Sequence, residues 1–270
     1  MGIRELTTEE KLGDEYCKHI VFHQLDGYIK FYESLSFSVM SWITGGTLAL
    51  INIDTYTYSS IQGTIESIKI VLQKGRVNDA YALLRKFYDV TMINIYNNLY
   101  LKNNYGLENI VVGEINNWIK GTATIPEYRV LSRYIKNDEC LSHITKLLNK
   151  DDRYKEIRSR CNDHTHYNFY RNLLANDNEV HDLNRIKDLG IFLNDLDNIF
   201  VQHFAYMFTI NQHYMSSSDY RDYIELGLTP EEDSKYWVAS FIQKLFDSVL
   251  KKKRPDIAIV MKEKTSMKLE

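Results

Sequence analysis

The sequence predicts a mainly α protein that folds as an antiparallel helical bundle, and three observations favour this class. Only three prolines occur in 270 residues, so few points force a helix to end. Apolar residues recur at intervals of three and four over several long stretches, which is the period of one helix face. The hydrophobic fraction of 44% and the aromatic fraction of 13% indicate a folded chain with a sizeable core.

The N-terminal part predicts one helix and one uncertain element. Residues 14–35 have Ile20, Leu25 and Ile29 near helical spacing. The stretch 34–53 that follows carries no charge and has Gly45-Gly46 at its middle. Two runs of strand formers around a two-residue turn predict a small β-hairpin. A buried helix is the second interpretation, and a membrane span is the third, because about 20 apolar residues cross a bilayer.

The next two helices are predicted as an antiparallel pair. Ile61, Ile65, Ile68 and Leu72 form one apolar face, and Gly75 is the predicted stop. Asn78 is the predicted N-cap of the following helix, which ends near residues 103–106. Because the connection at residues 74–76 is short, the two helices should be antiparallel neighbours.

The remaining helices are predicted from periodicity and capping. Short helices are expected at residues 114–120 and 127–136, a motif-bearing helix should run to Leu174, and a long helix should cover residues 183–214. Thr229-Pro230-Glu231-Glu232 is typical of a capping box with proline at the first helical position. The final helix should end at the basic run before Pro255.

These elements suggest three segments along one chain. Residues 1–57 would be an N-terminal elaboration, residues 58–215 the helical core, and residues 216–270 a C-terminal helix and tail packed on that core. Cys17, Cys140 and Cys161 are odd in number and widely spaced, which fits free thiols in a reducing compartment. Residues 1–5 carry no apolar signal segment, so a cytoplasmic protein is expected.

Charge excludes a general nucleic-acid coat protein but allows a local basic site. The formal net charge is −3, whereas such coat proteins are basic overall. Between Lys146 and Arg160, however, six cationic residues stand against three anionic ones. Arg153 and Lys155 lie in this stretch and are candidate RNA-binding residues. A solvated helix face of mixed charge is the alternative interpretation.

The strongest candidate for a functional site is the segment from Ile157 to Asn168. It contains two arginines, two asparagines, a carboxylate and two histidines within twelve residues. An arginine guanidinium can hold a phosphate through a rigid fork of donors, and histidine can move a proton near neutral pH. The alternative is a surface helix whose charged residues form salt bridges. The candidate residues are Arg158, Arg160, Asn162, Asp163, His164 and His166.

Two segments of the chain resemble the HEPN superfamily of helical domains, in its abortive-infection-like form. Residues 75–89 resemble a family helix that begins with an arginine and a nearby acidic residue. Residues 160–168 resemble the family's arginine followed by histidine after four to six residues. Arg160 with His166 satisfies this spacing, and so does Arg158 with His164. The first frame is preferred, because Asn162 would share a helix face with His166.

Two features of the motif depart from a simple assignment. Cys161 stands directly after Arg160, where active members usually place a polar residue. Residues six apart on a straight helix also differ in direction by about 120°, so Arg160 and His166 would converge only through long side chains or dimer apposition. Arg160 and His164 would share a face directly.

The resemblance implies a metal-independent endoribonuclease that needs no cofactor. An RNA 2′-hydroxyl would attack the neighbouring phosphodiester, with His166 as acid or base, Arg160 on the phosphate and Asn162 as an orienting group. The resemblance further implies a homodimer, a role as toxin or phage-defence effector, and an antitoxin or sensor protein as partner. A membrane is not an expected partner. The alternative is a catalytically inactive HEPN-like module that binds a protein or a nucleotide.

A metal site made of Asp163, His164 and His166 is a weaker hypothesis. Neighbours two apart on a helix point in nearly opposite directions, so the two histidines would not reach one ion together. No resident metal is therefore expected. The sequence also has no P-loop, dinucleotide fingerprint or nucleophile elbow.

Overall fold

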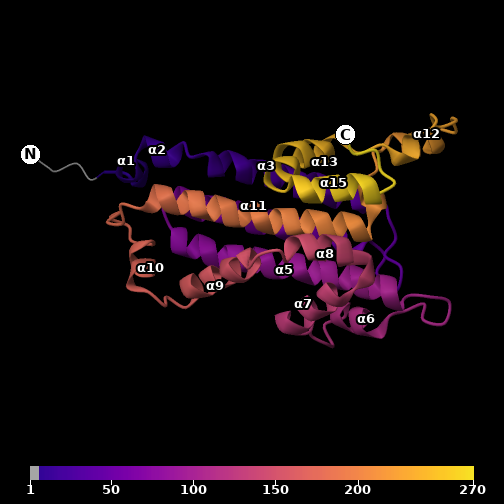
Figure 1. Ribbon diagram of the computed structural model, residues 1–270, viewed down its shortest axis with the longest axis horizontal. Helices are drawn as coiled ribbons and strands as arrows, with labels where there is room; N and C mark the ends of the chain where they lie inside the picture. The colour runs from indigo at the N-terminus through magenta and orange to yellow at the C-terminus, as the bar shows by residue number, and fades with distance from the viewer. Residues whose placement is uncertain (1–5) are drawn as a thin grey trace, which may run out of the picture. The chain divides into compact units, whose positions relative to one another are not determined.

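The computed structural model describes residues 6–270, and all the elements of secondary structure named in this range are helices. The mainly α prediction is therefore confirmed (Figure 1). Within the described range, no helix combines the length and apolar character that crossing a bilayer requires. Residues 1–5, on which the expectation about a signal segment depends, lie outside the described range. In chain order, the α-helices are α1 (Thr8–Leu12), α2 (Asp14–Cys17), α3 (Ile20–Val39), α4 (Ile53–Gln73), α5 (Val77–Asn104), α6 (Gly113–Ile119), α7 (Tyr128–Asn137), α8 (Ser142–Leu148), α9 (Arg153–Thr165), α10 (Tyr170–Leu174), α11 (Arg185–Ile210), α12 (Asp219–Glu225), α13 (Ser240–Leu245), α14 (Lys251–Lys253) and α15 (Pro255–Lys264).

The chain divides into two units, and neither is continuous in sequence. Unit 1 comprises Met1–Lys30, described from residue 6, with Ser60–Asp89 and Asp152–Ile199. Unit 2 comprises Phe31–Ser59, Val90–Asp151 and Phe200–Glu270. Each unit thus takes part of its core from α3, α4, α5 and α11, because the bounds of these long helices extend through both sets of ranges.

Unit 1 is built around apolar faces that the helical period places inward. Its buried side chains recur every three or four positions on each contributing helix, so each helix buries one stripe. The hydroxyl of Tyr16 donates to the carbonyl of Leu72 (2.8 Å), and that of Tyr28 donates to Asp197 (2.7 Å), so both tyrosines are buried without an unpaired hydroxyl. The core of unit 1 includes Val21, Leu25, Ile61, Ile65, Ile68, Leu84, Phe87, Ile157, Leu189, Phe192 and Leu196.

Unit 2 has an aromatic core. Phe31 packs edge-on against Phe200 (5.2 Å between ring centroids), and Phe204 packs in the same way on Phe208 (4.6 Å). Edge-to-face geometry is favourable because a positive ring edge meets a negative ring face. The long C-terminal segments add further apolar residues, among them Phe246, Val249 and Leu250 of a π-helical turn (Phe246–Leu250).

The β-hairpin expected within residues 34–53 is not formed. No strand is assigned in the described range, and α3 continues to Val39 because Tyr32, Leu35 and Val39 extend its buried stripe. Residues 40–52 form a loop instead. In this loop Gly46 pairs through a single parallel bridge with Val111, which lies far along the chain. The two runs of strand formers therefore do not pair with each other.

Three further boundaries differ from the expectations. The helix expected from residue 14 is interrupted at Lys18 and His19, between α2 and α3. Asn78 is not an N-cap, since α5 begins at Val77 and the Asn78 side chain is buried. The capping box at Thr229 does not start a helix, because residues 228–231 are irregular and the next α-helix begins at Ser240. A helix does end within the basic run, at Lys253, but it is not the final one, because Pro255 occupies the first turn of α15.

The tight turn between α4 and α5 depends on Gly75. Its φ is +73°, and a Cβ added there would lie 2.6 Å from Nη1 of Arg185 and 2.8 Å from Cδ2 of Leu12. Arg185 is buried and has little freedom to move, since it donates to the carbonyls of Gly75 (2.7 Å) and Asp177 (2.6 Å). Gly75→Ala is therefore expected to lower the free energy of unfolding by about 1–3 kcal/mol, measured by urea denaturation.

The matched control for this prediction is Gly27→Ala. Gly27 lies inside α3, and an added Cβ would meet nothing within 4 Å. This change should raise the unfolding free energy by up to about 1 kcal/mol through helix propensity. Equal effects of the two substitutions would contradict the role assigned to Gly75.

Candidate functional site

The candidate residues lie on α9 and the turn that follows it, all within unit 1. Tyr154, Ile157 and Cys161 face the core, three and four positions apart, and so orient the helix. The polar candidates occupy the flanks of this buried stripe. The expected continuation of this helix to Leu174 is wrong, because α9 ends at Thr165 and α10 begins only at Tyr170.

The first polar cluster joins α9 to α5 through Asp89. Its carboxylate accepts from Nη1 of Arg158 (2.7 Å) and from Nε of Arg85 (2.9 Å). Arg85 also donates to the amide oxygen of Asn162. Charge-assisted bonds of this kind are stronger than neutral ones, so this cluster fixes the side chains of Arg158 and Asn162 against α5.

The second cluster joins α9 to α11 through Asp195, whose side chain is 1% exposed. Nε of Arg160 donates to Asp195 (2.7 Å), and the hydroxyl of Tyr81 lies 3.5 Å from the same oxygen. Burial raises the pKa of the Asp195 carboxyl, and the bond from Arg160 opposes that shift. Nη1 of Arg160 makes no hydrogen bond to any described residue, so this nitrogen is left to bind an anion.

His164 lies against the second cluster and is held on both sides. Its Nδ1 donates to Oδ1 of Asn78 (2.8 Å), and its ring stacks on Tyr81 at 4.1 Å between centroids and 10° between planes. Burial lowers the pKa of His164 to about 4, so the ring is neutral at physiological pH. A neutral ring held in this way is suited to packing and unsuited to donating a proton.

His166 has a different environment from His164. It is the C-cap of α9, where its backbone N–H donates to the carbonyl of Asn162 (3.0 Å). Its side chain is exposed and makes no hydrogen bond to the residues that the structure describes. Tyr167 then adopts a positive φ of 50°, which turns the chain sharply away from the helix axis. A ligand can therefore approach the His166 ring without displacing a hydrogen-bond partner from the described residues.

Asp163 stabilises the turn after α9. Its carboxylate accepts from the amide of Asn168 (2.8 Å), and its carbonyl accepts from the amide of Asn172 (2.7 Å). These bonds hold the non-helical segment between α9 and α10. Among the described residues, no group of three histidine, cysteine or acidic side chains could hold a metal ion.

The two candidate RNA-binding residues differ in how accessible their charged groups are. Lys155 is exposed and forms a surface ion pair with Asp152 (2.6 Å), which water screens strongly. Arg153 donates to the side chain of Asn198 (3.1 Å) and is half-buried. Lys155 is therefore the more accessible cation of the two.

The structure brings Arg160 and His164 together around Tyr81, whereas no hydrogen bond in the described range joins Arg160 to His166. Sequence reasoning missed the partners that arrange these side chains. One sequence signal was available: Asp195 interrupts an apolar stripe of α11, between Phe192 and Leu196. A carboxylate in such a position needs a buried partner. The missed residues are Asn78, Tyr81, Arg85, Asp89 and Asp195.

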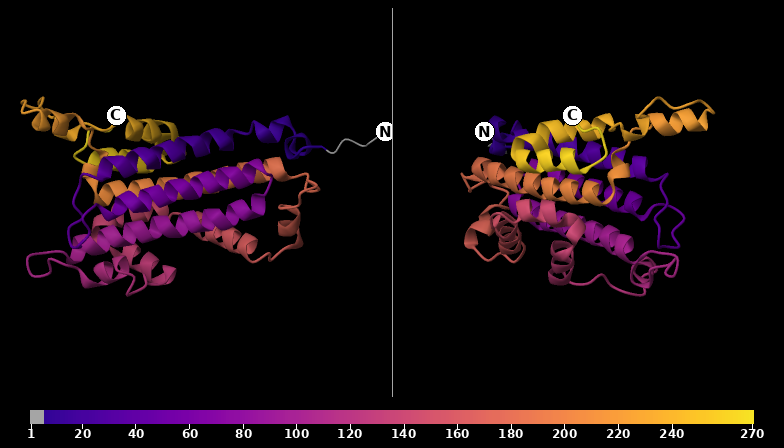
Figure 2. Two further views of the ribbon diagram at one scale, coloured as in Figure 1. Left: turned by 180° about the vertical axis from the view of Figure 1, so that it is seen from behind. Right: turned by 45° about the vertical axis from the view of Figure 1, so that its right-hand side comes forward.

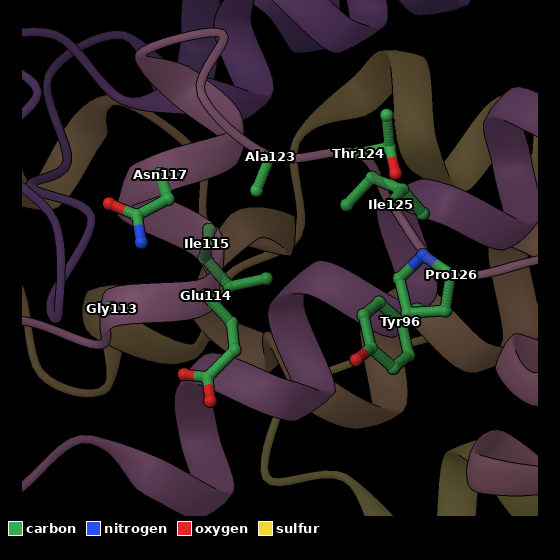
Figure 3. Close-up of a pocket in the computed structure, with 9 residues that line it drawn as sticks. All are labelled: Tyr96, Gly113, Glu114, Ile115, Asn117, Ala123, Thr124, Ile125 and Pro126. Atoms are coloured by element: carbon green, nitrogen blue, oxygen red, sulfur yellow. The ribbon is translucent and has the colours of Figure 1, made fainter.

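A cavity of about 310 Å³ in unit 2 offers different chemistry (Figure 3). The Glu114 side chain extends from α6, and the Tyr96 ring lies beside Pro126. Its lining contains no histidine or arginine, so it lacks the groups that RNA cleavage needs. The lining residues are Tyr96, Gly113, Glu114, Ile115, Asn117, Ala123, Thr124, Ile125 and Pro126.

Comparisons with protein-family models, with curated proteins and with solved structures found no match to this chain.

Proposed function

We propose that the protein is a metal-independent endoribonuclease of the HEPN type, with its site at the C-terminal end of α9. The observation that supports this most is the contact between the two segments that carry the family resemblance. Arg85 and Asp89 belong to the first segment, and they bind Asn162 and Arg158 of α9. Two separate parts of the sequence thus meet at one polar cluster.

The proposed roles follow from which atoms are free. Arg160 is fixed through Nε by Asp195, and its Nη1 would bind a phosphate oxygen. Asn162 accepts from Arg85 with its oxygen, so its amide nitrogen would be left to orient the reacting groups. His166 is exposed and would move the proton. Lys155 would hold a neighbouring phosphate of the RNA strand.

The proposed reaction is an internal transesterification. The RNA 2′-oxygen attacks the adjacent phosphorus, its proton passes to His166, and the bond from phosphorus to the 5′-oxygen breaks. The leaving 5′-oxygen takes a proton from a second acid, giving a 2′,3′-cyclic phosphate and a free 5′-hydroxyl. In a homodimer with facing α9 helices, the His166 ring of the second copy would be that acid. Such an enzyme would act as a cytoplasmic toxin or defence effector restrained by an antitoxin or sensor protein.

The test is cleavage of mixed tRNA and mRNA by the purified protein in EDTA, with the product ends identified by mass spectrometry. Cleavage that survives chelation and leaves cyclic phosphates is the expected result. Sedimentation at micromolar concentration should give the mass of a dimer. Cleavage that requires a divalent metal, or none at all, would overturn the proposal.

A second candidate is a catalytically inactive helical module that binds a protein or a nucleotide. The observation that favours it is that Asp89 and Asp195 already neutralise Arg158 and Arg160. A phosphate would have to share these guanidinium groups with carboxylates. In the same assay, RNA or nucleotide retained on the protein without cleavage would favour this candidate.

A further inference from the structure

Two loops of unit 2 present apolar side chains to solvent. One is the loop of residues 40–52 between α3 and α4, and the other is residues 105–112 between α5 and α6. Leu50 is 103% exposed, Leu107 98% and Ile43 90%, so almost nothing in the protein covers these side chains. We call the five most exposed aliphatic residues of the two loops, each at least 62% exposed, the apolar tips: Ile43, Leu48, Leu50, Leu107 and Ile110.

The two loops are fixed against each other. The backbone N–H of Val112 donates to the carbonyl of Gly46 (2.8 Å), and that of Leu48 donates to the side chain of Asn116 (3.2 Å). Gly46 has φ +86°, and a Cβ there would lie 2.9 Å from the side chain of Leu101. Figures 1 and 2 show both loops beside the C-terminal end of α5. The tips are therefore presented together by a preformed scaffold, which lowers the ordering cost of binding.

The chemistry of the loops is apolar and nearly free of charge. Residues 34–53 carry no charged side chain, and in residues 105–112 Glu108 is the single one. Trp42 and Tyr105 lie on the same loops, and these two residue types are enriched where proteins meet the headgroup region of a bilayer. The Trp42 ring is held by His213 (4.9 Å between centroids) and by the guanidinium of Arg221 (5.4 Å).

We propose that the apolar tips insert into the interfacial region of a lipid bilayer. A protein partner would need a separate pocket for each protruding side chain, whereas fluid acyl chains surround any shape. The exposed tips are aliphatic, and the side chains enriched at protein interfaces are aromatic or arginine. The loops themselves carry no cation, and the neighbouring Arg221 guanidinium is engaged by Trp42 and Ser41. Attraction to anionic headgroups therefore contributes little, and uncharged lipids should suffice. This peripheral contact is separate from the ribonuclease proposal, which concerns unit 1.

The test is flotation of the full-length protein with vesicles of pure phosphatidylcholine. The wild type is expected to float with the vesicles, equally at low and high salt and with or without phosphatidylserine. A triple variant with Leu48→Ser, Leu50→Ser and Leu107→Ser should have a partition coefficient into vesicles that is lower by a factor of at least about 100. These side chains are exposed, so the variant should fold, which an unchanged urea midpoint would verify.

The matched control is Leu183→Ser, the same change at a leucine of unit 1 that is 92% exposed. It should leave flotation unchanged. Three results would overturn the proposal: no flotation of the wild type, equal loss in the control, or binding that needs phosphatidylserine and disappears at high salt. A dimer that forms without vesicle binding and dissociates in the triple variant would show instead that a second copy of the chain covers the tips.

Discussion

Replacing His166 with alanine is expected to slow RNA cleavage by about 100- to 10,000-fold, the usual contribution of one acid–base group. The unfolding free energy should change by less than about 0.5 kcal/mol, because the side chain is exposed and has no hydrogen-bond partner among the described residues. Single-turnover cleavage in EDTA and urea denaturation of the same preparation measure the two quantities. The combination is what distinguishes a reacting group from a structural one.

His164→Ala is the matched control, and the opposite pattern is expected. The ring stacks on Tyr81 and donates to Asn78, so its loss should destabilise the protein by about 1–2 kcal/mol. The folded variant should retain most of its cleavage rate. If His164→Ala abolished cleavage while His166→Ala had no effect, His164 would be the reacting histidine and our assignment would be wrong.

The helices could be predicted where local sequence and burial agree. Ile61, Ile65, Ile68 and Leu72 do form a buried stripe of α4, since a period of 3.6 residues needs no knowledge of the partner helix. The β-hairpin predicted for residues 34–53 was wrong for a physical reason. Its first residues belong to α3, and Gly46 finds its backbone partner at Val112, more than sixty positions away. The propensities of neighbouring residues give no information about a partner so far along the chain.

The candidate site was predictable as a segment but not as an arrangement. The residue types of α9 identified a polar stretch, yet which histidine is free depends on Asn78 and Tyr81 of α5. The break after Thr165 separates His166 from the helix and leaves it exposed. That break depends on bonds from Asn168 and Asn172 to Asp163, which resemble ordinary polar residues in the sequence.

A buried polar network in unit 2 underlies the second large effect. Asp54, in the first turn of α4, is buried and accepts hydrogen bonds from Asn94 (2.7 Å), Asn98 (3.0 Å) and the hydroxyl of Tyr214 (2.9 Å). Because Asn94 donates its amide to Asp54, its oxygen faces His203, whose Nε2 therefore donates to it (2.9 Å). Burial raises the pKa of Asp54 from 3.8 to about 6, and its three hydrogen bonds oppose that shift.

This raised pKa predicts that Asp54 favours folding in acid. The folded state holds the Asp54 proton more tightly than the unfolded chain does, so stability from this group is present below about pH 4 and is lost as the pH rises through 6. The loss should approach about 3 kcal/mol by neutral pH, since one pKa unit corresponds to 1.36 kcal/mol. Asp54→Asn is neutral at every pH and isolates the effect.

The measurement is the difference in unfolding free energy between the wild type and Asp54→Asn, from urea denaturation across this pH range. As the pH rises, the unfolding free energy of the wild type should decrease by about 3 kcal/mol relative to that of Asp54→Asn. His203, whose pKa burial lowers to about 3, titrates in the opposite sense, gaining stability as the pH rises. Because both proteins carry it, its contribution cancels in the difference. A difference independent of pH would mean that Asp54 titrates alike in the folded and unfolded chains, and that its hydrogen bonds offset burial completely.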